Sequence, residues 1–217
     1  MEDRIIIYSA IAADYDDLVE QPNLPDGVEL QILIDGDFDE VFDAPVRTAK
    51  KPKVLPHRIP GFDKFDVSIW IDGNYQVVGD VREMVNRHLA EKPIALFAHP
   101  DGRKDCYEEA HLCWRLGLDD KETILKQIGR YRNIGYTQQG PMTGCAILAR
   151  RHNEPDVQNA MQKWWAEIRD NSYRDQISFS PSMWLAGLRY EVIDQDMRNN
   201  EWFRKVAKHK GRRKRSS

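Results

Sequence analysis

Short runs of apolar, often β-branched residues alternate with longer amphipathic stretches along most of the chain. Such runs are typical of buried strands, whereas apolar residues three and four apart indicate helices. The predicted strands cover residues 4–10, 28–35, 67–72, 93–98 and the stretch up to Arg150 that follows a turn at Gly140. The predicted helices cover residues 80–90, with Asp80 as N-cap, and residues 106–116, 119–131, 155–169 and 176–187. Residues 44–60 are rich in proline and lysine and are expected to form an irregular connection.

The alternation of strands and helices predicts a layered α/β sheet rather than an all-β sandwich. At 217 residues the chain suits one domain, and no internal repeat or linker divides it before residue 204. We therefore expect one domain over residues 1–203, followed by a basic and flexible tail over residues 204–217.

Charge separates the tail from the body. The net charge of the chain is −3, yet the eight lysines and arginines from Arg204 onward leave residues 1–203 with 24 basic against 35 acidic residues. An acidic body argues against a broad nucleic-acid-binding face, although the tail itself is suited either to contact phosphates or to remain solvated. Three cysteines without a CxxC pair argue against disulfides and a zinc ribbon, and no apolar stretch is long enough to span a membrane. A cytoplasmic location is the simplest expectation.

Polar residues stand where the third predicted strand ends. Asp72, Gly73 and Asn74 can present carboxylate and amide oxygens to Mn²⁺ or Mg²⁺, which would neutralise a diphosphate, although the same three residues are common in plain hairpins. The basic stretch before this strand includes Lys50, Lys51, Lys53, His57 and Arg58, which can hold a diphosphate or can be solvated surface residues.

Several short motifs recur in the order found in one known family. They are Lys53-Val-Leu-Pro-His57, Asp66-Val-Ser-Ile-Trp-Ile-Asp-Gly-Asn74, Phe97-Ala-His-Pro100, Cys106-Tyr-Glu-Glu-Ala110, Gly144-Cys-Ala-Ile-Leu-Ala-Arg-Arg-His152, Trp164-Trp-Ala-Glu167 and Arg174-Asp-Gln-Ile-Ser-Phe179. With these motifs the chain resembles the mucilage-related and turgor-defect glycosyltransferase-like domain family. The resemblance implies a GT-A-like, Rossmann-like mixed sheet flanked by helices, in which a D-x-D element at a strand end binds metal and sugar nucleotide.

The resemblance also implies roles for particular residues. Asp72 and Asn74 stand at the D-x-D element, with Asn74 in place of its last aspartate, and His209 is the candidate for a late histidine that completes the metal site. The position of Asp175, apart from the resemblance, makes it the candidate catalytic carboxylate, because a charged residue at a predicted helix entrance beside Arg174 can face a cleft and stay ionised. It can act either as a base toward the acceptor hydroxyl or as a stabiliser of an oxocarbenium-like centre. A plain N-cap paired with Arg174 is the alternative interpretation of Asp175.

The remaining candidates for contacts with the nucleotide sugar follow from position. His99 ends a predicted strand on the edge expected for Asp72, and only one of Glu108 and Glu109 can face a given substrate atom, with Glu109 preferred. Gly144 would allow close approach to the backbone. The predicted function is transfer of a sugar from a nucleotide-diphospho-sugar, most simply a UDP-sugar, to a glycan or to a modified base in DNA. The alternative is a nucleic-acid-binding module that uses the basic tail on a catalytically degenerate scaffold.

Overall fold

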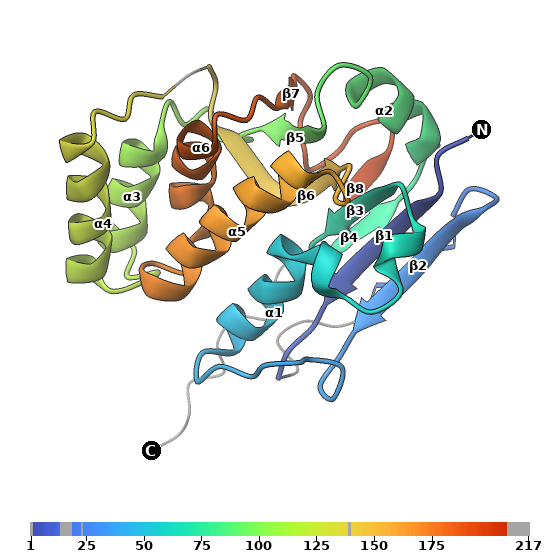
Figure 1. Ribbon diagram of the computed structural model, residues 1–217, viewed down its shortest axis with the longest axis horizontal. Coiled ribbons are helices and arrows are strands. Elements are labelled where there is room, and N and C mark those ends of the chain that lie inside the picture. The colour runs from blue at the N-terminus through green and yellow to red at the C-terminus, as the bar shows by residue number, and fades with distance from the viewer. Residues whose placement is uncertain (1, 14–18, 23, 139, 208–217) are drawn as a thin grey trace.

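A sheet of buried strands runs through the centre of the protein, with helices packed on both of its faces (Figure 1). This arrangement comes from a computed structural model, which describes residues 2–13, 19–22, 24–138 and 140–207. Within these residues six strands form the main sheet: β1 (Ile5–Ala10), β2 (Val28–Leu33), β3 (Val67–Ile71), β5 (Ile94–Ala98), β6 (Thr143–Arg150) and β7 (Glu191–Ile193).

The main sheet has the order β2-β1-β3-β6-β5-β7 and is mixed. Strand β1 is parallel to β2 and β3, whereas β6 is antiparallel to both β3 and β5, and β7 is parallel to β5. A second, two-stranded antiparallel sheet joins β4 (Tyr75–Val77) to β8 (Phe203–Lys205). The prediction of a mixed α/β sheet flanked by helices in one domain is therefore confirmed.

Side chains of each strand alternate between two apolar layers, as the pleat requires. Ile6 and Tyr8 of β1 pack in the layer beneath α1 (Pro45–Val54) and α5 (Pro155–Asp170), to which α6 (Asp175–Ala186) also contributes. Ile5 and Ile7 pack in the opposite layer, with α2 (Val81–His88) and the second sheet. Helices α3 (Cys106–Arg115) and α4 (Lys121–Asn133) form a third cluster against α6. Two short 3-10 helices, η1 (Pro56–Arg58) and η2 (Phe62–Lys64), follow α1.

The predicted irregular connection over residues 44–60 is wrong for its first half, because α1 occupies Pro45–Val54. Pro45 suits the first turn of a helix, but Pro52 lies inside α1 and cannot donate a backbone hydrogen bond. Contacts from distant residues stabilise this last turn, as described below for the site. Asp80 caps α2 as expected, since its side chain accepts a hydrogen bond from the backbone N–H of Arg82 at 2.9 Å.

The predicted boundary between body and tail also shifts. Strand β8 continues to Lys205 and pairs with β4, so Arg204 and Lys205 belong to the second sheet rather than to a tail. Among the residues that the structure describes, no helix is long and apolar enough to cross a membrane.

Candidate active site

A cavity of about 560 Å³ opens at the carboxyl ends of the parallel strands β1 and β3. The residues after β1, the side chains of α1 and the start of α6 line it, together with Asp72 and Gly73 directly after β3. Ligands bind at this edge in open α/β sheets, and the volume lies in the range of small-molecule sites. The cavity is therefore the candidate active site.

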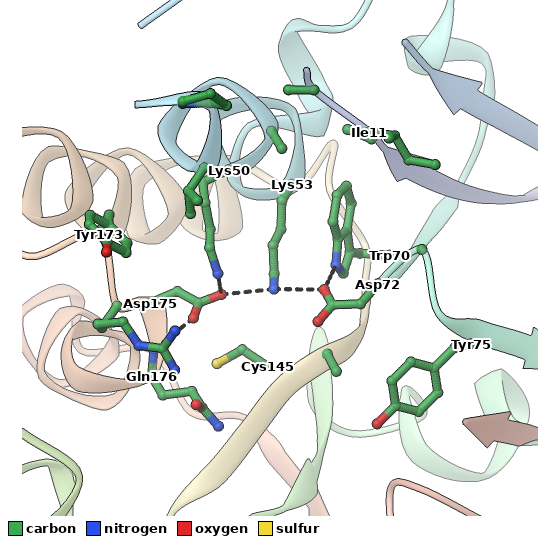
Figure 2. Close-up of a pocket in the computed structure, with 18 of the residues that line it drawn as sticks. Ile11, Lys50, Lys53, Trp70, Asp72, Tyr75, Cys145, Tyr173, Asp175 and Gln176 are labelled. Atoms are coloured by element: carbon green, nitrogen blue, oxygen red, sulfur yellow. Dashed lines mark hydrogen bonds and ion pairs between the residues drawn. The ribbon is translucent and has the colours of Figure 1, made fainter. Parts of the chain in front are cut away.

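Four charged side chains form a row across the cavity, and we call this row the lysine–aspartate chain (Figure 2). The ammonium of Lys53 lies 2.8 Å from the Oδ2 atom of Asp175 and 3.3 Å from the Oδ1 atom of Asp72. Lys50 forms an ion pair with the same Oδ2 atom of Asp175. The indole N–H of Trp70 donates to the Oδ1 atom of Asp72 at 2.8 Å. The two carboxylates are thus joined through one buried ammonium group.

Three elements that are distant in the sequence bring this row together. Lys50 and Lys53 are three residues apart on α1 and so point from the same side of that helix. Asp72 leaves β3 with its backbone N–H bound to the carbonyl of Ala146 at 2.8 Å. Asp175 is the first residue of α6, where the helix dipole favours a negative charge.

The last turn of α1 is anchored by two buried side chains of the sheet. The Tyr8 hydroxyl donates to the carbonyls of Pro52 and Lys53, at 3.2 and 3.0 Å. The guanidinium of Arg150 donates to the Lys53 carbonyl and to the Tyr8 hydroxyl. No carboxylate pairs with Arg150 within the described residues, so the partners of this fully buried cation are neutral groups near the negative end of the α1 dipole.

The two lysines of the row differ in the direction in which their surroundings shift the pKa. Burial disfavours the charge of Asp175, but Lys50 and Lys53 outweigh that effect and hold its pKa well below the usual range. Burial likewise disfavours the charged form of Lys53, yet Asp175 and Asp72 raise its pKa. Burial lowers the pKa of Lys50 despite its ion pair with Asp175. Lys50 is therefore the more readily deprotonated of the two.

The residues present do not fit the predicted Mn²⁺ or Mg²⁺ site. Hard divalent cations need several oxygen ligands. The cavity has two carboxylates, Asp72 and Asp175, and the Lys53 ammonium lies between them where a shared cation would have to bind. In the described part of the chain no group of three or more His, Cys, Asp or Glu residues could hold a metal ion.

The structure brings together about half of the predicted site residues. Those of them that line the cavity are Lys53, Asp72, Gly73, Arg174 and Asp175. Arg174 takes the N-cap position of α6, so the alternative of Asp175 as N-cap does not describe this helix start. His209 lies outside the described residues.

Asn74 lies away from the cavity although it is only two residues from Asp72. Its side chain is 2% exposed, and its amide donates to the carbonyl of Ala207 at 3.2 Å. Its backbone carbonyl accepts from the N–H of Val206 at 3.0 Å. The two polar residues of this turn therefore have different contacts: Asp72 faces the cavity, whereas Asn74 binds the backbone of Val206 and Ala207.

Four other predicted contacts also lie outside the cavity lining. His57 is in η1, where burial and the nearby cation Arg150 lower its pKa to about 4. His99 lies 3.8 Å from Glu109, whose carboxylate also binds Arg103 and the Cys113 thiol in a separate cluster at α3. At Gly144 a Cβ atom would lie 2.8 Å from the Sδ and Cε atoms of the Met197 side chain.

Trp70, Tyr75 and Lys205 are among the cavity residues that sequence reasoning missed. Trp70 had a usable signal, because residues two apart on a strand share a face and Trp70 precedes Asp72 by two. Lys205 had none, since its place beside the cavity depends on the pairing of β8 with β4.

The fold and the cavity together define a class of protein: a single α/β domain whose mixed sheet carries a lysine-lined cavity at the carboxyl ends of its parallel strands. The comparison with protein families places it more narrowly. Residues 33–211 match the model of the TOD1/MUCI70 glycosyltransferase-like domain, and the chain belongs to that family. The resemblance found in the motifs is thereby confirmed.

One relative is the probable hexosyltransferase MUCI70 of Arabidopsis thaliana, which is 34% identical over 145 residues and matches 62% of this chain. The matched part spans 24% of that relative, about a quarter of its length.

Two solved glycosyltransferase structures show a weak likeness. One is the crystal structure of a glycosyltransferase involved in the glycosylation of the major capsid of PBCV-1. Its TM-score is 0.48 at 8% identity, and the match covers 88% of this chain and 81% of that one. The other is mouse xyloside xylosyltransferase 1 in its apo form, with a TM-score of 0.47, 10% identity and coverage of 89% and 86%. Neither likeness bears on the chemistry of the cavity.

Proposed function

We propose that this chain transfers a sugar from a nucleotide-diphospho-sugar to an acceptor hydroxyl. Membership of a glycosyltransferase-like family supports the reaction class. The observation that carries the proposal is the pair of the half-buried Lys50 and the buried Lys53, which face a cavity of suitable size beside Asp72 and Asp175. In this reaction the bond from the anomeric carbon to a phosphate oxygen breaks, a bond from that carbon to the acceptor oxygen forms, and the acceptor proton leaves to a base.

The two lysines are proposed to hold the diphosphate. An ammonium group binds phosphate oxygens as a point charge, and the effect is strongest where water is excluded. Lys53 is 2% exposed, and the side chain of Lys50 is 18% exposed. As the diphosphate enters, the lysines exchange part of their contact with Asp175 for phosphate oxygens. Because Lys53 also occupies the place of a shared cation, we propose that donor binding requires no divalent metal.

Asp175 is proposed as the catalytic carboxylate. With its pKa lowered by Lys50 and Lys53, it stays ionised at neutral pH but is a weak proton acceptor. This favours electrostatic stabilisation of an oxocarbenium-like centre over service as a base. A rate that stays level across neutral pH would support stabilisation, whereas a rate that follows one ionisation in that range would support another group as base.

The proposal also includes a particular donor and a particular acceptor. A UDP-sugar is the expected donor and a glycan hydroxyl the expected acceptor. A modified base in DNA stays a prediction that rests on the basic run Lys208–Arg215 in the sequence. Removal of residues 208–217 should then weaken DNA binding and leave nucleotide binding intact. If the chain binds DNA but no nucleotide, the nucleic-acid-binding module is the better description.

Thermal shift with UDP, GDP and CDP, each with EDTA or with Mn²⁺, tests the central claim. At least one nucleotide should raise the melting temperature, to the same extent in EDTA as in Mn²⁺. Lys53→Met should abolish the rise, whereas Lys51→Met should keep it. Lys51 lies on the same helix, but its ammonium binds Asp39 and Glu40, at 2.7 and 2.8 Å, outside the cavity. A rise that needs Mn²⁺ would refute metal-free binding, and no rise with any nucleotide would refute the function.

A further inference from the structure

The segment over residues 199–207, which we call the C-terminal strap, is fastened beside the cavity. Trp202 and Phe203 are buried, at 1% and 0% exposure. The strap passes so close to Gly79 that a Cβ atom there would lie 2.0 Å from the carbonyl oxygen of Glu201. Beyond β8, Asn74 holds the backbone of Val206 and Ala207. These contacts give the strap a fixed position.

This position places Lys205 at the Asp72 end of the cavity. Lys205 lies opposite Tyr75 in the β4–β8 pair, and both residues line the cavity. Tyr75 follows Asp72 through a tight turn, in which the N–H of Tyr75 donates to the Asp72 carbonyl at 3.0 Å. In Figure 2, Tyr75 lies beyond Asp72 on the side away from Lys53. The cavity thus receives Lys53 from α1 and Lys205 from the strap.

The charge of Lys205 differs in its surroundings from the charges of the two lysines on α1. Its side chain is exposed, and it forms no ion pair or side-chain hydrogen bond within residues 2–13, 19–22, 24–138 and 140–207. The charges of Lys50 and Lys53, in contrast, are matched by Asp175 and Asp72.

The surplus of charge in the cavity is therefore small. Its lining has a surplus of two positive charges, from Lys50, Lys53, Arg174 and Lys205 against Asp72 and Asp175. Lys205 supplies half of that surplus, and a diphosphate requires positive charge beyond what the two aspartates already neutralise.

We propose that Lys205 is a phosphate-binding residue of this site, which contacts the diphosphate of the bound nucleotide from the side opposite α1. This assignment rests on the proposed function. It explains why the third residue of the Asp72-Gly73-Asn74 turn holds the strap: Asn74 positions the segment that carries Lys205.

The test compares Lys205→Ala with Arg204→Ala. Arg204 is the neighbouring residue of β8, is exposed and does not line the cavity, so its loss removes the same charge from the same strand. Isothermal titration would measure the dissociation constants of UDP, GDP, CDP and uridine at low and at moderate salt. Both variants alter exposed side chains and should melt close to the wild type.

Lys205→Ala should weaken binding of the preferred nucleoside diphosphate about tenfold, the effect of one lost charge-assisted hydrogen bond, with a smaller salt dependence. Binding of uridine, which has no phosphate, should not change, and Arg204→Ala should bind like the wild type. Equal weakening in both variants, or none in Lys205→Ala, would overturn the role of Lys205 while leaving the function intact. A wild-type protein that binds no nucleotide would refute the function and the assignment together.

Discussion

Replacement of Asp175 by asparagine should separate the three roles of this carboxylate in stability, binding and transfer. Asp175 is 5% exposed and is the main partner of two buried ammonium groups. Removing one partner of a buried ion pair costs about 3 to 5 kcal/mol. We expect the lower value, about 3 kcal/mol, because the amide oxygen still accepts a hydrogen bond and Lys50 can turn toward cavity water. For a chain of this length that is a fall in melting temperature of roughly 6 to 12 °C.

Nucleotide binding and transfer should change in opposite directions in Asp175→Asn. The loss of one negative charge raises the positive surplus of the cavity, so UDP should bind more tightly than to the wild type. Sugar transfer should fall by at least two orders of magnitude, because the carboxylate at the reacting centre is gone. Calorimetry measures the change in UDP binding, and single-turnover kinetics measure the change in sugar transfer.

The pH dependence of the stability difference provides a further check. Since the pKa of Asp175 is lower in the folded protein than in the unfolded chain, its stabilisation is complete above about pH 4 and is lost as the pH falls below that value. The difference in free energy of unfolding between wild type and Asp175→Asn should therefore decrease as the pH falls below that value.

Asp170→Asn serves as the control for these measurements. Asp170 pairs with Arg169 at 2.6 Å on the surface, and its loss should cost less than about 1 kcal/mol. An Asp175→Asn protein that melts like this control would refute the buried lysine–aspartate chain. Weaker UDP binding would refute the electrostatic argument, and retained transfer would refute the catalytic role.

Three other substitutions or measurements test parts of the fold. Tyr8→Phe should cost about 1 to 3 kcal/mol in urea unfolding, because buried Arg150 loses an acceptor and α1 loses its anchor; an unchanged midpoint would contradict this. Gly79→Ala should destabilise the protein by about 1 to 3 kcal/mol, because the new Cβ atom would clash with the backbone of Glu201. Gly129→Ala in α4 has open space around it and should be neutral or stabilising. Equal effects of the two substitutions would show that the strap is not held at Gly79. The thiols of Cys106 and Cys113, whose pKa burial raises to about 12, should resist Ellman's reagent until the protein unfolds, and rapid labelling of the folded protein would disprove their burial.

Local pattern was sufficient to predict most of the strands and the two carboxylates of the site. The run before Asp72 is apolar except for Ser68 and is buried on both faces, so its end could be placed within one residue. Asp175 stands in a motif at a helix start, and a helix does begin there. Each of these features depends on neighbours in the sequence.

Features that depend on distant residues could not be predicted in this way. Pro52 argues against a helix by itself, and α1 persists because Tyr8 and Arg150 bind the carbonyls of its last turn. The same helix brings Lys53 between Asp72 and Asp175, a contact that joins three separate elements. The position of the Lys53 ammonium between the two carboxylates could therefore not be predicted from the Asp72-Gly73-Asn74 motif.

The C-terminal strap has a consequence for biosynthesis and turnover. Residues 199–207 are made last in this part of the chain, yet they carry Lys205, which lines a cavity whose first lining residue is Ala10. A ribosome-bound chain would have its main sheet translated before Lys205, and under the proposed function it would gain full affinity for the donor only once the strap leaves the exit tunnel. Proteolytic cleavage just before residue 199 would reverse that step, removing Lys205 from a cavity that keeps the lysine–aspartate chain.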